Sequence, residues 1–365
     1  MDNSTKGSPP SLANDDDALP LHAAASAGDL SRLRALLDSN NHNHNHDPNT
    51  PDASGSTPLH MAANAGHWAI CRLLLERGAL PTIQNGHDSL PLHLAAKQGH
   101  VEIVRLLLEC DATAGTPTAN AKSKNQNTPL FYAAARGYAE IVSLLLDNGA
   151  SSSVSWAPFG ENALHVAAAG GHVAVCEGLL RFEKEKENKA IGMSLLRSLG
   201  IGSGIVSAKN LRKHTPFACA VLKGHSAVVE AFLRSAMVST SDKDGDGVYL
   251  FHRAVKNGNL EIVKAFLEHG VKVDMTDKFS STALHFAAET QNVDIIRLLL
   301  DYGASLEKKD FLGLTPDRLA QGAELTMLMR NHVKQRTEAQ NKLAGKEKAP
   351  SPSAGIAEPP PEYTK

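Results

Sequence analysis

One stretch, Ser56–Ala79, constrains the fold of this chain more than any other, because its pattern is a pair of short helices. It is STPLHMAANAGHWAICRLLLERGA, in which Thr57 suits an N-cap and Pro58 suits the first helical position. Gly66 suits the left-handed end of the first helix, and an aliphatic second helix then runs to Gly78. A helical hairpin of this size cannot bury its own apolar side, so it must stack on copies of itself.

Copies are present along most of the chain. The slot of Thr57 recurs at Leu19, Leu90, Thr128, Asn162, Thr215, Tyr249, Thr282 and Thr315. The spacing is close to 33 residues wherever no extra loop intervenes, as from 57 to 90 and from 282 to 315. A period of about 33 residues that carries TPLH-x-A is the signature of ankyrin repeats. The best matches are Thr57–His60 and Leu90–His93.

The chain therefore resembles the ankyrin-repeat family over about residues 19–330. The resemblance implies an all-α fold, an ankyrin-repeat solenoid of about nine helix–turn–helix repeats with short β-turn connections. Composition agrees, since 42% hydrophobic and 21% charged residues in 365 suffice for the core of one long stack.

The net charge and the cysteines indicate which classes of partner and which cellular compartment to expect. A net charge of −2 favours neither nucleic acid nor an anionic membrane as a partner. The four cysteines are far apart in sequence, which indicates small buried side chains in a reducing compartment rather than disulfides. The sequence shows no signal peptide and no apolar run of about 18 residues. We therefore expect a cytoplasmic and/or nuclear protein.

The repeats define the expected domain boundaries. Residues 1–17 are predicted to be a disordered N-terminal segment and residues 18–330 the repeat domain, with an insertion at 182–210. Residues 331–344 are expected to be a helical extension and 345–365 a disordered proline-rich tail. Inside the insertion lies an apolar cluster, which either folds back on the stack or is offered to a partner: Met193, Leu195, Leu196, Leu199 and Ile201.

Two segments have partial metal-binding patterns. His42, His44 and His46 could chelate a transition metal, but a loop without fixed supporting residues favours a plain insertion. The segment Asp242–Gly247 resembles the start of a calcium loop, yet Arg253 stands where a glutamate ligand is needed. The same aspartate and glycine spacing recurs between other repeats, which indicates a connecting turn. We therefore predict neither a metal nor a cofactor.

Histidines recur at one slot of the motif, at His22, His60, His93, His165, His252 and His285. In the ankyrin family such a histidine is structural and forms hydrogen bonds around the adjacent turn. No acidic or cysteine cluster accompanies the row, and no nucleophile elbow, phosphate loop or dinucleotide motif occurs. The sequence therefore predicts no enzyme.

The remaining expected function is recognition. The resemblance implies that the first helices and the turn tips line a concave binding face. Aromatic residues and arginines are common at binding hot spots, and polar residues project from the ends of these helices. The predicted protein-binding residues are Met61, Asn64, Lys97, Tyr132, Arg136, Arg253, Lys256, Phe286 and Glu289. Phe159, Phe279 and Phe311 at the turn tips either bind a partner or stack on neighbouring turns.

The tail carries a second recognition pattern. Pro360, Pro361 and Tyr363 match the PPxY ligand of WW domains, in which the prolines hold an extended helix and the tyrosine fills an aromatic groove. Such a short pattern also arises by chance, so the segment is either a WW-domain ligand or a chance match. WW domains occur in several families of HECT ubiquitin ligases, which would be the implied partners.

The sequence thus favours a monomeric, non-enzymatic scaffold or adaptor that grips a protein target and recruits a second protein through its tail. One alternative is a chaperone or a regulatory subunit of a larger complex, like the proteasome-associated ankyrin proteins. The other is a metal-dependent protein that uses its histidine-rich loop.

Overall fold

The computed structural model describes residues 19–39, 47–115, 118–154, 159–189 and 204–347. The N-terminal segment 1–17, the histidine loop, the apolar cluster of the insertion and the PPxY residues therefore lie outside the described residues. The chain divides into two compact units, Met1–Leu250 and Phe251–Lys365, and each is described by itself.

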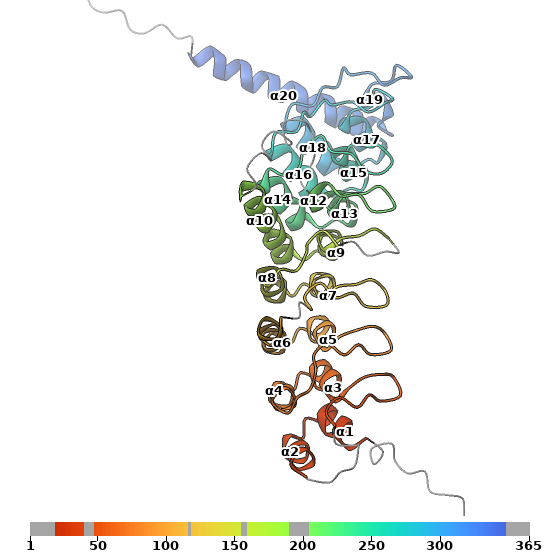
Figure 1. Cartoon of the computed structure of the whole chain (residues 1–365). Helices are drawn as coiled ribbons and strands as arrows, with labels where there is room; N and C mark the ends of the chain where they lie inside the picture. The colour runs from red at the N-terminus through yellow and green to blue at the C-terminus, as the bar shows by residue number, and fades with distance from the viewer. Residues whose placement is uncertain (1–18, 40–46, 116–117, 155–158, 190–203, 348–365) are drawn as a thin grey trace, which may run out of the picture. The chain divides into compact units, whose positions relative to one another are not determined.

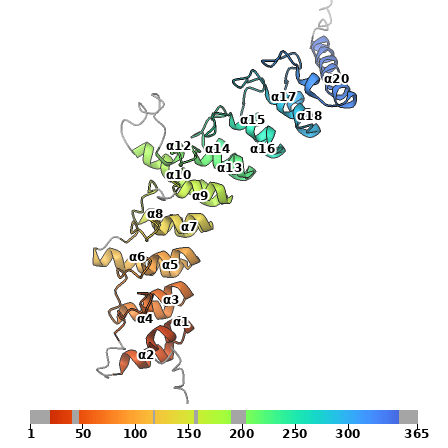
Figure 2. The ribbon, with the colours of Figure 1, turned by 90° about the vertical axis from the view of Figure 1, so that its right-hand side faces the viewer.

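The first unit consists of two rows of helices (Figure 1). The inner row is α1 (Pro20–Ala27), α3 (Pro58–Ala65), α5 (Pro91–Gln98), α7 (Pro129–Arg136), α9 (Ala163–Gly170) and α13 (Pro216–Lys223). The outer row is α2 (Leu30–Asp38), α4 (Trp68–Glu76), α6 (Val101–Ala114), α8 (Ala139–Asp147), α10 (Val173–Lys189) and α14 (Ser226–Ser235). A short helix, α12 (Gly204–Ser207), lies between α10 and α13 in sequence. Each helix packs on its neighbours in its own row and on its partner in the other row, and Figure 2 shows the pairs following one another.

The second unit continues the pattern. Its helices are α15 (Leu250–Lys256), α16 (Leu260–Glu268), α17 (Ala283–Glu289), α18 (Val293–Asp301), α19 (Pro316–Leu319) and α20 (Ala323–Glu347). Helix α17 packs on α18 and α19, and α20 packs on α18 and α19. The described residues contain isolated β-bridges but no strand, so the predicted all-α class is confirmed.

Local sequence signals determine where each inner helix begins and ends, as α3 illustrates. The side chain of His60 accepts a hydrogen bond from the backbone N–H of Thr57 at 3.1 Å. This bond gives an acceptor to an N–H group that has none within the helix. Pro58 follows, and Gly66 ends the helix with φ of 87°. Ala62 is fully buried and small enough for the helices of neighbouring repeats to pack closely.

Loops that we call fingers connect the repeats, and they project beside the inner helices (Figure 1). In the first finger, Oδ1 of Asp52 accepts hydrogen bonds from the backbone N–H groups of Ser54 and Ser56, both at 2.8 Å. Asp244 makes the same turn, with bonds of 2.9 Å from Asp246 and Val248. The calcium-like segment therefore folds as a connecting turn, as the repeat spacing predicts. The same turn recurs at Asn85, Asn210, Asp277 and Asp310.

The repeated histidine of the motif, in the repeats that have it, ties its own repeat to the next one. Because Nδ1 of His60 is the acceptor for Thr57, Nε2 carries the proton and donates to the carbonyl oxygen of Ser89 in the following finger at 2.9 Å. Burial disfavours the charged ring, so the pKa of His60 lies below its ordinary value. The same bridge recurs from His22 to Ser56, His93 to Ala121 and His165 to His214, and in the second unit from His252 to Met275 and His285 to Leu314.

A second row of histidines, which the sequence analysis missed, ties repeats in the opposite direction. Nε2 of His100, at the start of the outer helix α6, donates to the carbonyl oxygen of Asn64 in α3, the inner helix of the preceding repeat, at 3.1 Å. Gly66 makes room for this ring, since a Cβ atom there would lie 2.6 Å from it. The bond recurs from His67 to Ser26, His172 to Ala135 and His225 to Ala169. These bonds satisfy carbonyl groups that helix ends otherwise leave open.

Both ends of the segment 182–210, expected to be a single insertion, are part of the first unit. Glu183 is buried on α10, and its carboxylate accepts a hydrogen bond of 2.6 Å from the hydroxyl of Ser152. Ile205 is buried on α12, and its carbonyl oxygen accepts a bond of 3.0 Å from Asn162. Side chains from both ends of this segment are therefore buried against the repeats beside them.

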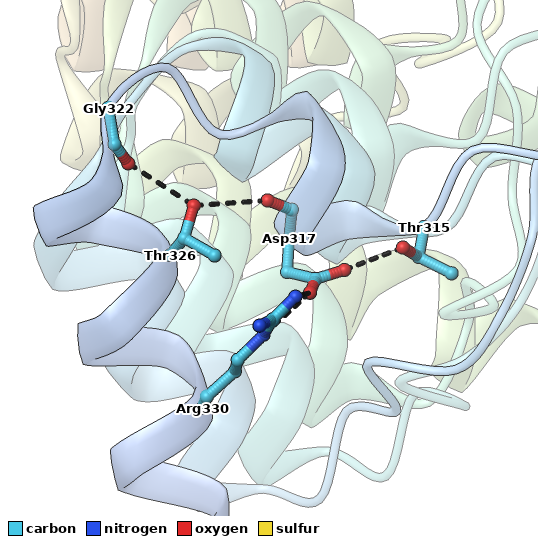
Figure 3. A network of polar contacts seen from close by, with 5 residues as sticks. All are labelled: Thr315, Asp317, Gly322, Thr326 and Arg330. Atoms are coloured by element: carbon cyan, nitrogen blue, oxygen red, sulfur yellow. Dashed lines mark hydrogen bonds and ion pairs between the residues drawn. The ribbon is translucent and has the colours of Figure 1, made fainter.

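Helix α20 covers the end of the second unit and spans the boundary that the sequence placed at residue 331. The side chain of Arg330, on this helix, donates a hydrogen bond to the carboxylate of Asp317 with an Nε–Oδ2 distance of 2.9 Å. The hydroxyl of Thr326 donates to the backbone carbonyl oxygen of Asp317 (Figure 3). Partial burial opposes ionisation of Asp317, but the bonds from Thr315 and Arg330 outweigh it and lower its pKa. Met329 is fully buried, so this helix belongs to the core of the second unit.

Candidate protein-binding face

The exposed sides of the inner helices of the first unit and the adjoining fingers form one surface, which we call the inner face. Helix α3 shows how the repeat places side chains on it. Leu59 and Ala62 are fully buried, whereas Met61 is half-buried and Asn64 is exposed. The same register leaves Lys97, Tyr132 and Arg136 on this face. Five of the predicted binding residues therefore share one face of the first unit.

Two of these five meet in a cleft. The cleft has a volume of about 270 Å³ and lies where α5 and α7 join their fingers. The ammonium group of Lys97 lies 5.8 Å from the ring centroid of Tyr132, within range of a cation–π interaction. The hydroxyl of Tyr132 also lies 3.4 Å from that of Ser123, and its ring meets His93 edge-on. Lys124 completes the cleft on the finger side.

A second cleft on the inner face was not predicted. It measures about 400 Å³ and is formed by α13 and the fingers beside it. Arg212, Lys223, Leu222, Phe159 and Glu161 line it. Lys223 occupies the same position of its repeat as Arg136, so the repeat alignment contained the signal for this site.

The other four predicted residues lie in the second unit. Lys256 and Glu289 are exposed, and Arg253 and Phe286 are half-buried. The ring of Phe286 packs against His252 with centroids 5.3 Å apart. These residues share the inner-helix register of the second unit.

The aromatic residues at the finger tips differ in their contacts. Phe279 and Phe311 of the second unit stack with centroids 5.5 Å apart, which supports the stacking alternative for this pair. Phe159 of the first unit instead lines the second cleft and remains 46% exposed.

The comparisons with known proteins agree with this architecture. A family profile described as "Ankyrin repeats (3 copies)" matches residues 21–116, 92–191 and 217–310, which together exceed half of the chain. The chain belongs to the ankyrin-repeat family. Among solved structures, it is similar to the ankyrin repeat domain of Bcl-3, described as a unique member of the IkappaB protein family. The TM-score is 0.56 at 24% identity, covering 66% of this chain and 98% of that one, which supports the fold alone. No curated protein matches the chain.

Ankyrin repeats are typical interaction domains, and two cysteines of this ankyrin-repeat protein are fully buried in its repeats. Burial raises the pKa of the Cys71 and Cys176 thiols to about 12, so neither is a ready thiolate nucleophile. In the part of the chain that the structure describes, no group of three or more histidine, cysteine or acidic residues could hold a metal ion. Within the same residues, no helix is both long and apolar enough to cross a membrane.

Proposed function

We propose that this ankyrin-repeat protein is a non-enzymatic adaptor that binds a protein target through the inner face of its first unit. The observation that carries the proposal is the repeated exposure of one or two residues per inner helix, on helices whose other residues are buried or half-buried. Lys97 and Tyr132 already converge on one cleft there. Residues without a packing role can change without loss of the fold, which suits a surface selected for binding.

The proposal extends to the C-terminal tail, the oligomeric state and the cellular compartment of the protein. The motif of Pro360, Pro361 and Tyr363 would recruit a WW-domain protein, such as a HECT ubiquitin ligase, independently of the repeats. The protein would act as a monomer in the cytoplasm and/or nucleus. The cysteines of the repeats suit a reducing compartment, since none of the four is in a disulfide.

The target is tested by affinity capture with the immobilised full chain, followed by mass spectrometry. The matched variants are Tyr132→Ala with Arg136→Ala on the inner face, and Arg72→Ala with Arg105→Ala on the outer helices. We expect specific proteins that are lost with the inner-face variant and retained with the outer one. Equal capture by both variants would contradict the proposed face. Recovery of all subunits of one large assembly would indicate the alternative of a regulatory subunit.

The tail is tested separately with a WW-domain array and a peptide of residues 350–365. We expect the wild-type peptide to bind and Tyr363→Ala to abolish binding, because the aromatic slot is emptied while the prolines remain. If both peptides bind equally, or neither binds, the chain is a repeat scaffold without a second binding site for a WW domain.

A further inference from the structure

The inner helices of the first unit carry charge of one sign. Among the described residues, α1, α3, α5, α7, α9 and α13 contain three cationic side chains, Lys97, Arg136 and Lys223, and no carboxylate. The fingers add Lys124 to the first cleft and Arg212 to the second. All five cations are exposed. The fingers also carry exposed carboxylates, such as those of Asp88 and Asp246, so the excess of cations lies on the inner helices and in the two clefts. We call these five cations the basic stripe.

The outer helices show that this imbalance is local. There Arg72 pairs with Glu76 at 2.9 Å, and Arg105 lies 3.5 Å from Glu140. Arg234 lies 3.3 Å from Glu230. Each cation is partly neutralised by a carboxylate of its own or the neighbouring helix.

The five inner-face cations have no such neutralisation. Within the described residues, none of them lies within ion-pair distance of a carboxylate. One carboxylate, Glu161, lines the second cleft and accepts a bond from Asn210. Unpaired like charges on one surface repel one another, and an anionic ligand relieves that repulsion while gaining attraction and faster association.

The clefts also contain apolar surface. Leu94 and Tyr132 line the first cleft, and Leu222 and Phe159 line the second. Leu94, Tyr132 and Leu222 are half-buried, and Phe159 is exposed. A ligand that matches both features needs carboxylates for the cations and apolar side chains for the clefts. Nucleic acid fits less well, because phosphate binding usually relies on a strongly basic domain and this chain has a net charge of −2.

We propose that the inner face of the first unit binds an extended acidic peptide segment of its partner protein. Carboxylates of the segment contact Lys97, Lys124, Arg136, Arg212 and Lys223, and its apolar side chains enter the two clefts. This inference rests on the proposed function, in which the same face binds a protein, and it specifies the chemistry of the bound segment.

The test is selection of a phage-displayed library of random 16-residue peptides on the full-length chain. We expect enriched peptides to carry an excess of aspartate and glutamate, interrupted by apolar residues. The strongest peptide is then labelled, and its affinity is measured by fluorescence polarisation. The variant Lys97→Glu, Arg136→Glu, Lys223→Glu should bind it at least about tenfold more weakly. Added salt should weaken binding to the wild type.

The matched control reverses three outer-helix cations, Arg72→Glu, Arg105→Glu and Arg234→Glu, and should retain the affinity. Circular dichroism and thermal unfolding of both variants establish that the repeats remain folded. Enriched peptides without acidic excess, or equal affinities of the two variants, would overturn the acidic specificity and leave the proposed function standing. No enrichment of any peptide would count against both. Equally tight binding of a labelled 20-nucleotide single-stranded DNA would assign the basic stripe to nucleic acid instead.

Discussion

The two rows of helices in the first unit use the same repeat in different ways. Outer helices bury large aliphatic side chains such as Leu74 and hold several of their surface charges in ion pairs. Inner helices bury alanines and a histidine such as His60, which is anchored by hydrogen bonds to the backbone. Stability through apolar volume thus lies mainly in the outer row. The inner row buries fewer large side chains, such as Leu59, beside its alanines, and the exposed side chains of its helices are available for recognition.

The largest effect should come from removing apolar volume in the outer row. Leu74 is fully buried, so Leu74→Ala should lower the free energy of unfolding by about 2–5 kcal/mol through lost transfer energy and a cavity. Equilibrium denaturation by urea measures this change. The control Leu80→Ala removes a side chain that is 52% exposed and should cost under about 0.5 kcal/mol. Similar losses for both variants would contradict the assignment of the core.

The next effect concerns the histidine bridges and pH. Burial lowers the pKa of His93 to about 4 and lowers those of His60 and His165 below 6.5. On acidification these histidines therefore take up protons in the unfolded chain before they do so in the folded one. Their contribution to the free energy of unfolding is fully present above pH 6.5 and is lost as the pH drops towards about 4. For His93 the total loss is on the order of 3 kcal/mol.

Urea denaturation between pH 7 and pH 4 measures this loss. His93→Gln retains a donor for Ala121 but cannot take up a proton, so it should reduce the slope of stability against pH. A wild-type stability that does not change over this range would refute the role of the buried rings.

A smaller effect should report whether α12 belongs to the core. Ile205 is 1% exposed, so Ile205→Val should cost about 0.5–1.5 kcal/mol. Leu211→Ala, at a finger position that is 72% exposed, is the control and should lie within about 0.5 kcal/mol of wild type. Denaturant unfolding compares the two. An unaffected Ile205→Val would return the whole segment 182–210 to the status of a separable insertion.

The smallest effect on stability is expected on the inner face. Tyr132 is half-buried, and it contacts Lys97, the hydroxyl of Ser123 and the edge of the His93 ring, so Tyr132→Ala should cost about 1 kcal/mol of unfolding free energy. Binding should suffer more, because tyrosines at hot spots contribute about 2 kcal/mol or more. Thermal unfolding and the affinity of a selected peptide measure the two quantities. A large loss of stability with unchanged affinity would show that Tyr132 stabilises the fold and does not bind the peptide, contrary to the role assigned to the inner row.

Features carried by a few neighbouring residues could be predicted from the sequence alone. Thr57, Pro58 and Gly66 determine the bounds of α3 through groups within one or two helical turns. The aspartate turn at Asp244 is equally local. Because these signals recur at a nearly constant spacing, they also predict the number and order of the repeats.

Features that join one repeat to another required the tertiary structure. The bond from His100 to Asn64 spans 36 residues, and the space for it depends on Gly66. The packing of Ile205, the approach of Lys97 to Tyr132 and the cleft between Arg212 and Lys223 likewise join separate elements. The physical reason is that a side chain's neighbours across the stack depend on how helices of different repeats pack. That packing depends on the volumes of many residues together, and no single motif encodes it.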